Sequence, residues 1–263
     1  MEAASKQRLA CVAVATLLVM AFANSPQRSP DGIEMIAMVR GWFSEKPSGV
    51  AAWYWPPLWP ILAVGLGLGR WAEPAGYMLN AGCAAGTAYF LYGLASRATG
   101  QRAEASWVPA LVTLAYATLP AIHEQVATLD ARALGSFLLV AAAESTLSAR
   151  AASPGATAQK AWLFAGSLAF LAPLARPEGV LTAAGVAAVA GFGAMRTREG
   201  RADPRLWAVA LATIGIAAGA FLGSGRAWET LTLPWIGVWP RGDILALYGF
   251  ASAPTPYREW VLA

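Results

Sequence analysis

The chain carries few charged residues. Only 13% of its 263 residues are Asp, Glu, Lys or Arg, whereas 57% are hydrophobic. In a soluble globular domain about a quarter of the residues are charged. These charges are too few to cover a compact soluble surface, and the apolar residues come in long blocks. The composition therefore predicts an all-α, polytopic helical membrane protein.

Cysteine and histidine are also scarce, with two Cys and one His. Cys11 and Cys83 both lie inside apolar blocks, where a free thiol acts as a small hydrophobic residue, so no disulfide framework is expected. His123 stands beside Glu124, but a metal site usually needs three or four ligands. We therefore expect no metal and no cofactor. A divalent ion would be compatible with the acids described below, but nothing indicates one.

The net charge of +4 does not indicate a nucleic-acid surface. The Lys and Arg residues fall in short clusters between apolar blocks, which is how loops flank transmembrane helices. The expected partner is thus the lipid bilayer, and no nucleic acid is expected.

The apolar blocks predict about seven or eight transmembrane helices, since a spanning helix needs about 20 residues. Many small residues within the blocks allow helix backbones to approach closely. A signal peptide is an alternative for the first block, because Ala21-Phe22-Ala23 has the small-x-small form of a cleavage site. The blocks cover residues 9–23, 57–71, 75–96, 106–121, 131–149, 160–175, 178–195 and 205–223.

Basic residues predict the topology. Lys6 and Arg8 place the N-terminus inside and residues 24–56 on the outer face, as expected for a bacterial inner membrane protein. The basic clusters near residues 97–102, 150–160 and 196–205 also predict inner loops. Strict alternation conflicts with this assignment if both 57–71 and 75–96 cross the membrane. One of these two segments is therefore expected to be short or re-entrant.

We expect a membrane module over residues 1–223 and a surface loop over residues 224–263. The outer loop, residues 24–56, has apolar residues at helical spacing from Ile33 onwards, which predicts a short helix lying in the membrane interface. Aromatic residues in and just after this loop are expected at the headgroup level; they are Trp42, Trp53, Tyr54, Trp55 and Trp59.

Ionisable residues near spans are costly and are therefore candidates for function. Asp31 and Glu34 would share one face of a helix that begins near Gly32, where Asp31 could equally be a helix cap. Asp130 could cap the next span. Pro177 and Glu178 suit a helix start, and Arg176 could either anchor the topology or bind a phosphate through its planar guanidinium.

Five segments stand in this order along the chain: Asp31-Gly32-Ile33-Glu34, Pro56-Pro57-Leu58-Trp59-Pro60, Thr128-Leu129-Asp130, Arg176-Pro177-Glu178-Gly179 and Tyr248-Gly249…Pro254-Thr255-Pro256-Tyr257-Arg258. In this order they resemble the GT-C glycosyltransferase superfamily, whose multi-spanning enzymes use polyprenyl-phosphate sugars. The segment Arg176–Gly179 is similar to the corresponding motif of the mannosyl- and arabinosyltransferase-like branch. The segment Tyr248–Arg258 is a degenerate form of a later motif of that branch. Relatives often have a second acid where Gly32 stands, and they continue through further spans.

The resemblance implies an inverting transfer of a sugar from a polyprenyl-phosphate donor to a hydroxyl of a lipid, glycan or protein on the outer face. Asp31 would be the catalytic base, and Arg176 and Arg258 would bind the departing phosphate. The resemblance implies substrate-binding roles for Glu34, Asp130, Arg176, Glu178, Tyr248 and Arg258.

Two alternatives stay open. One is a non-catalytic membrane scaffold or transporter subunit, in which the acids are caps and the Trp residues form an interfacial belt. A transporter should have ionisable residues inside its spans and repeats of broken helices. Here the charges lie at span ends and no repeat is evident, which favours an interfacial enzyme. The other alternative is an inactive N-terminal part of a GT-C relative.

Overall fold

The computed structural model describes residues 2–23, 26–28, 32–33, 35–37, 39, 58–100, 107–152, 155–196 and 203–223. Within these ranges the fold is all-α, as predicted, with one isolated bridge between Gln27 and Thr128. The helices are α1 (Glu2–Phe22), α3 (Leu58–Leu66), α4 (Ala72–Ala98), α5 (Val108–Ala117), α6 (Pro120–Ala127), α7 (Arg132–Ala151), α8 (Ala156–Ala175), α9 (Gly179–Arg196) and α10 (Pro204–Gly223).

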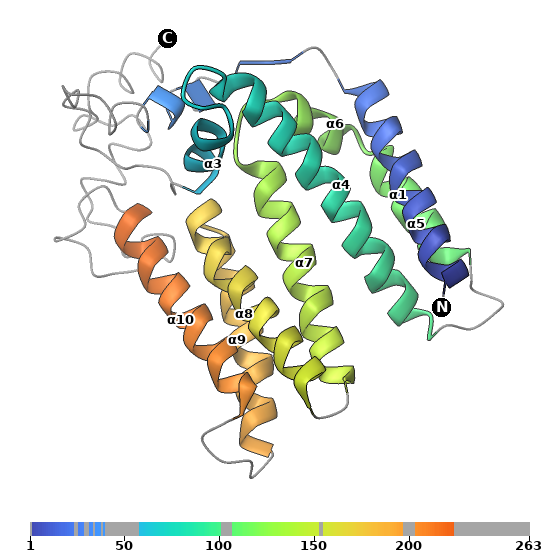
Figure 1. The fold of residues 1–263 in the computed structure, drawn as a ribbon, viewed down its shortest axis with the longest axis vertical. Helices are drawn as coiled ribbons and strands as arrows, with labels where there is room; N and C mark the ends of the chain where they lie inside the picture. Colours follow the sequence, from blue (N-terminus) through green and yellow to red (C-terminus); the bar gives the residue numbers. More distant parts are fainter. Residues whose placement is uncertain are drawn as a thin grey trace.

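The long helices run side by side along the bundle, and α3 and α6 lie at one end of it (Figure 1). We call the end with α3 and α6 the upper end; it also holds the turn between α8 and α9. The lower end holds the turn between α7 and α8 and the start of α1. The chain passes up through α1, down through α4, up through α5 and α6, and then alternates through α7, α8, α9 and α10 (Figure 1).

Helix α3 removes the conflict in the topology that the sequence left open. It has nine residues, about 14 Å at 1.5 Å per residue, and is too short to cross a bilayer core of about 30 Å. The turn after it includes Leu68 and Gly69, both with positive φ, and leads into α4. The block 57–71 thus contains a short helix at the upper end, and the C-terminal ends of α4, α7 and α9 all lie at the lower end.

The block 106–121, expected as one helix, is divided into α5 and α6. Thr118 and Leu119 separate them, and Pro120 is the first residue of α6. Proline has no N–H to continue the hydrogen bonds of α5, but it suits the first position of a new helix. The blocks from residue 131 onwards agree with α7 to α10 to within four residues.

Small residues bring α8 and α10 into close contact. A Cβ at Gly166 would lie 2.8 Å from the Cα of Ala208, and one at Gly215 would lie 2.5 Å from the Cα of Phe170. Such contacts need glycine because the backbones themselves touch. The close approach of helices predicted from the small residues is therefore present here.

Among the described residues, one helical stretch is long and apolar enough to cross a membrane, Ser5–Phe22 in α1. Its side chains are mostly exposed, with only 11% of the stretch buried. Shorter apolar stretches occupy Val108–Ala117, Gly179–Met195 and Pro204–Ala220.

Two expectations about the outer loop and its aromatic residues need correction. The described residues between 32 and 39 are helical, but Met35, Ile36 and Val39 are buried in the main core, so this segment packs into the protein. Trp59, expected at the headgroup level, is fully buried. Its indole N–H donates to Asn80, which explains how so large a polar ring is accommodated there.

Candidate functional site

At the upper end, segments that are far apart in the chain meet. Gly32 packs directly against the backbone of Leu129, and a Cβ at Gly32 would lie 1.7 Å from the Leu129 carbonyl oxygen. Only a residue without a side chain can come this close. Asp130 follows Leu129, so two of the acidic motifs recognised in the sequence meet at this contact.

Backbone hydrogen bonds fix this contact in register. The Gln27 N–H donates to the Ala127 carbonyl (2.7 Å), and the Leu129 N–H donates to the Gln27 carbonyl (3.2 Å). The Tyr77 hydroxyl of α4 donates to the same Gln27 carbonyl (3.1 Å). The segment that follows α1 is therefore tied both to the α6–α7 connection and to α4.

Asn80 of α4 joins the elements beneath this contact. Its side chain is fully buried and accepts the Trp59 indole N–H at 2.9 Å. Its amide nitrogen donates to the carbonyls of Thr128 (2.8 Å) and Gln125 (3.3 Å). Buried polar groups must be paired, so this one amide links α3, α4, α6 and the connection to α7.

The Thr128 hydroxyl is different. It is buried, and no hydrogen-bond partner is present for it in the part of the chain that the structure describes. Buried side-chain oxygens are normally satisfied. The Thr128 hydroxyl is therefore an exception beside the Leu129–Gly32 contact.

Asp130 is held by Arg132. One oxygen, Oδ1, accepts the Arg132 backbone N–H at 2.7 Å, and Oδ2 accepts the Arg132 Nε–H at 2.6 Å. The Arg132 guanidinium also donates to Glu124 at 2.9 Å. The expected cap at the start of α7 is present, made by Asp130 from one residue before Ala131, the N-cap residue. The Asp130 side chain is 13% exposed and the Glu124 side chain 54% exposed, so the cluster opens towards solvent on its Glu124 side.

Arg176 and Glu178 form a bidentate ion pair in the turn between α8 and α9. Arg176 donates through Nε and Nη2 to the two Glu178 oxygens, both at 3.0 Å. The Arg176 hydrogen bonds lower the pKa of Glu178 from its usual value, although partial burial acts in the opposite direction. Helix α9 begins at Gly179, so Pro177 lies two residues before the helix instead of at its first position.

Two glycines position this ion pair. A Cβ at Gly179 would lie 2.1 Å from the Ala172 carbonyl oxygen, so the turn can fold back on α8 only because residue 179 is glycine. A Cβ at Gly135 would lie 2.8 Å from the Arg176 Cδ, so the Arg176 side chain crosses the first turn of α7. Arg176 and Asp130 therefore flank the same start of α7.

Of the residues proposed from the sequence, the structure brings Asp130, Arg176 and Glu178 to the upper end. The expected base, Asp31, lies outside the described residues, although the next residue, Gly32, is at the Leu129 contact. Glu34, Tyr248 and Arg258 also lie outside the described residues, as does the proposed surface loop, residues 224–263.

The sequence analysis overlooked Asn80 and Arg132, which organise the site. Asn80 is an amide in the middle of an apolar block, and this position could have indicated a buried hydrogen-bonded side chain. His123, the single histidine of the chain, lies in α6 with its Nε2 2.7 Å from the Ala117 carbonyl oxygen, and its ring stacks on Phe22. Its role in the described structure is packing.

In the described part of the chain, no group of three His, Cys, Asp or Glu side chains lies close enough to hold a metal ion. Beside the Leu129–Gly32 contact and the start of α7, the described polar groups are the Asp130–Arg132–Glu124 cluster, the Arg176–Glu178 ion pair and the unpaired Thr128 hydroxyl. Comparison of the chain with protein-family models, curated proteins and solved structures gives no match.

Proposed function

We propose that the chain is a multi-spanning membrane protein of the GT-C type, which transfers a sugar from a polyprenyl-phosphate donor to a hydroxyl on the outer face. The observation that carries the proposal is the convergence at the upper end. Gly32 contacts Leu129, and Arg176 crosses Gly135, so segments of three sequence motifs that are far apart along the chain share one end of the bundle. An enzyme that works on a lipid-linked donor needs its groups on one membrane face.

Helix lengths support a membrane bundle. Helices α7, α8 and α10 have 20 residues each, about 30 Å, which matches the hydrocarbon core of a bilayer. Large apolar side chains are exposed on several helices, as on a lipid-facing surface; examples are Leu17 (69%), Met78 (76%) and Leu181 (74%). We propose seven crossings, made by α1, α4, α5 with α6, α7, α8, α9 and α10.

The distribution of charged residues supports one orientation of the bundle in the membrane. By their positions along the helices, the residues with described side chains give six Lys or Arg against two acids towards the lower end, and four against four towards the upper end. Inner loops of membrane proteins are enriched in Lys and Arg, so the lower end would face inward and the site outward. The lower residues are Lys6, Arg8, Arg97, Arg150, Lys160 and Arg205 with Glu144 and Asp203; the upper residues are Arg28, Arg70, Arg132 and Arg176 with Glu73, Glu124, Asp130 and Glu178.

In the proposed reaction the Asp31 carboxylate takes the proton of the acceptor hydroxyl. The acceptor oxygen forms a bond to the anomeric carbon as the bond from that carbon to the phosphate oxygen breaks, and the electron pair leaves with the lipid phosphate. That phosphate is already a good leaving group and needs no proton. A well-placed carboxylate base contributes about 10²–10⁴-fold to such a step.

Arg176 is the proposed partner of the departing phosphate among the described residues. It already holds two oxygens of Glu178 with two parallel N–H bonds, and a phosphate presents oxygens that a guanidinium can bind in the same way. In this proposal Glu178 occupies Arg176 until the donor phosphate displaces it.

The test is sugar transfer in membranes from a strain that lacks the native protein, supplied with radiolabelled polyprenyl-phosphate sugars. Asp31→Asn should reduce transfer by at least about 100-fold at equal protein abundance, because it removes the base. Glu73→Gln is the matched control, since Glu73 is an upper-end acid paired with Arg28 at 3.1 Å and lies outside the motifs.

Equal transfer by wild type and Asp31→Asn would leave Asp31 as a helix cap. Loss of transfer in Glu73→Gln as well would indicate a general effect of upper-end charge. If wild-type protein transfers none of the sugars offered, the scaffold interpretation gains over the enzyme.

A further inference from the structure

A second polar cluster lies in the lower half of the bundle, away from the proposed transfer site. Glu144 of α7 is buried, at 8% exposure. Its Oε1 accepts the Arg97 Nε–H of α4 at 3.2 Å and the Ser148 hydroxyl at 3.1 Å. A charged residue this deep in a membrane bundle is costly and usually functional. The sequence analysis placed all the charges at span ends and overlooked Glu144.

Arg8 of α1 approaches the same place from the other side. Its Nε and Nη2 both donate to the Tyr89 carbonyl, and its guanidinium stacks on the Tyr89 ring at 3.4 Å. A Cβ at Gly93 would lie 2.9 Å from the Arg8 Nη2 and 3.0 Å from the Glu144 Oε1. Both side chains therefore reach over Gly93, and there is one carboxylate for two guanidiniums.

These groups line a cavity of about 310 Å³ that also includes Ser5, Tyr92 and Ser96. Its charged lining residues are Arg8, Arg97 and Glu144, which gives a net charge of +1. Arg97 uses Nε and Nη2 for Glu144 and Ser148, and a guanidinium has five N–H donors in total. The cavity thus retains positive charge and donors suited to an anion.

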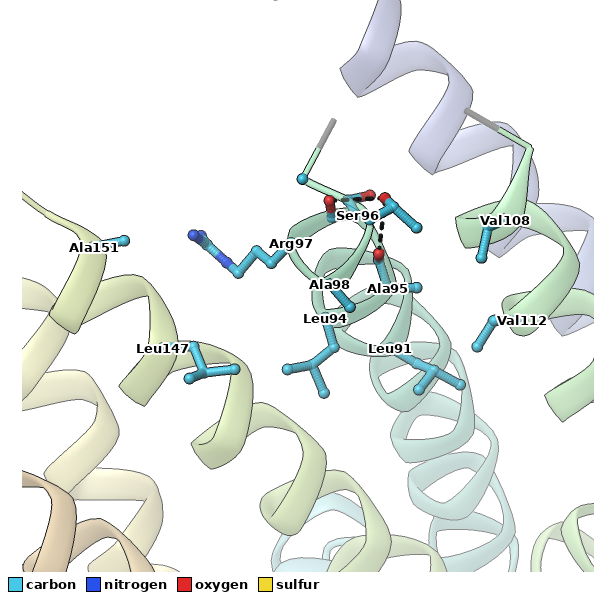
Figure 2. A pocket seen from close by; sticks show the side chains of 12 residues that line it. Leu91, Leu94, Ala95, Ser96, Arg97, Ala98, Val108, Val112, Leu147 and Ala151 are labelled. Carbon is cyan, nitrogen blue, oxygen red and sulfur yellow. Dashed lines mark hydrogen bonds between the residues drawn. The ribbon is translucent and has the colours of Figure 1, made fainter. Parts of the chain in front are cut away.

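An apolar groove adjoins the cavity and shares Ser96 and Arg97 with it. The groove has a volume of about 870 Å³ and lies between α4, α5 and α7. Figure 2 shows Arg97 extended towards the α7 side, with Leu91 and Leu94 on the floor, Leu147 on one wall and Val112 on the other. Arg97 therefore stands between a polar cavity and an apolar groove.

We propose that this paired cavity and groove bind one anionic glycerophospholipid of the inner leaflet. The phosphate would bind Arg97 and Arg8, and an acyl chain would lie against Leu91, Leu94 and Val112. The charge of the cavity selects an anion, the adjoining apolar groove selects a lipid, and the basic lower end places both at the inner surface. The inference rests on the proposed membrane orientation and is independent of the transferase activity.

The test is lipid binding to the detergent-purified protein, measured by native mass spectrometry with phosphatidylglycerol and with phosphatidylcholine. Wild type should bind one phosphatidylglycerol more tightly than phosphatidylcholine. Arg97→Gln and Arg8→Gln should each weaken phosphatidylglycerol binding by about fivefold, the effect of one basic residue at an anionic headgroup. Arg150→Gln is the matched control, because Arg150 is an exposed residue in the last turn of α7 and lines neither space.

The direction in which Glu144→Gln changes phosphatidylglycerol affinity distinguishes an anion site from an internal ion pair. If the cluster binds an anion, removing the competing carboxylate should strengthen phosphatidylglycerol binding. If the cluster is only an internal ion pair, the same change should lower the melting temperature without any gain in lipid affinity, and the proposal would be overturned.

Two further outcomes would also overturn it. One is an equal loss of binding in Arg150→Gln, which would indicate general surface charge. The other is binding of inorganic phosphate without preference for the lipid, which would indicate a soluble anion. Sugar transfer is not part of these measurements, so a failure here and a failure of the transferase proposal are distinguishable.

Discussion

Two helices of this bundle begin with the same Asp-x-Arg arrangement, one at each end. At the upper end, Asp130 accepts the Arg132 backbone N–H at 2.7 Å and pairs with its guanidinium at 2.6 Å before α7. At the lower end, Asp203 accepts the Arg205 backbone N–H at 2.9 Å and faces its guanidinium at 3.6 Å before α10. Arg205 also donates to the Gly193 carbonyl at 2.9 Å.

The comparison shows that the Asp–Arg pair alone does not mark a site. Locally, both carboxylates act as caps that satisfy N–H groups at a helix start. What differs is the surroundings: Asp130 follows the Leu129–Gly32 contact, and Arg176 crosses the same helix start, whereas Asp203 is 2% exposed and enclosed. The convergence of distant segments, and not the residue pair, distinguishes the upper end.

The largest expected difference between the two ends is their accessibility from outside the cell. In a variant without Cys11 and Cys83, a cysteine at the Leu68 position, which is 86% exposed in the turn between α3 and α4, should react with a membrane-impermeant maleimide in intact cells. A cysteine at the exposed Ala156 position should react only after lysis. Labelling of both positions in intact cells, or of Ala156→Cys alone, would contradict the proposed orientation.

The next effect concerns the Asn80 network, which the lower end does not share. Asn80→Leu would leave the buried Trp59 N–H and Thr128 carbonyl without this partner. Each unpaired buried group costs about 1–3 kcal/mol, so for two groups we expect a loss of about 2–6 kcal/mol in the free energy of unfolding. Denaturant unfolding measures it, with the exposed Gln159→Ala as control. A loss no larger than that of the control would show that the network contributes little to stability.

The smallest expected effect is the loss of the helix cap that Asp130 or Asp203 makes. Asp130→Asn and Asp203→Asn should each lower stability by about 0.5–2 kcal/mol, the usual range for loss of a helix cap. Only Asp130→Asn should also reduce sugar transfer in the membrane assay, since only Asp130 lies beside the converging motifs. An equal reduction of transfer in both variants would mean that the effect comes from stability alone.

Several features followed from the sequence because they depend on local chemistry. The low charge and the apolar blocks predicted an all-α fold, and α7 to α10 begin and end within four residues of the predicted blocks. The conflict between helix count and basic loops correctly indicated that the block 57–71 or 75–96 is short. Pro120, however, should have been given more weight as the start of a separate helix.

The tertiary structure alone decided which residues meet. Periodicity cannot reveal that Gly32 touches Leu129, that Arg176 crosses Gly135, or that Trp59 is buried on Asn80, because these contacts join residues at least 21 positions apart. It also could not reveal that Glu144 lies between helices with Arg97 and near Arg8. Local sequence sets where helices begin and end, whereas the packing of small residues sets which faces come together, and function depends on those faces.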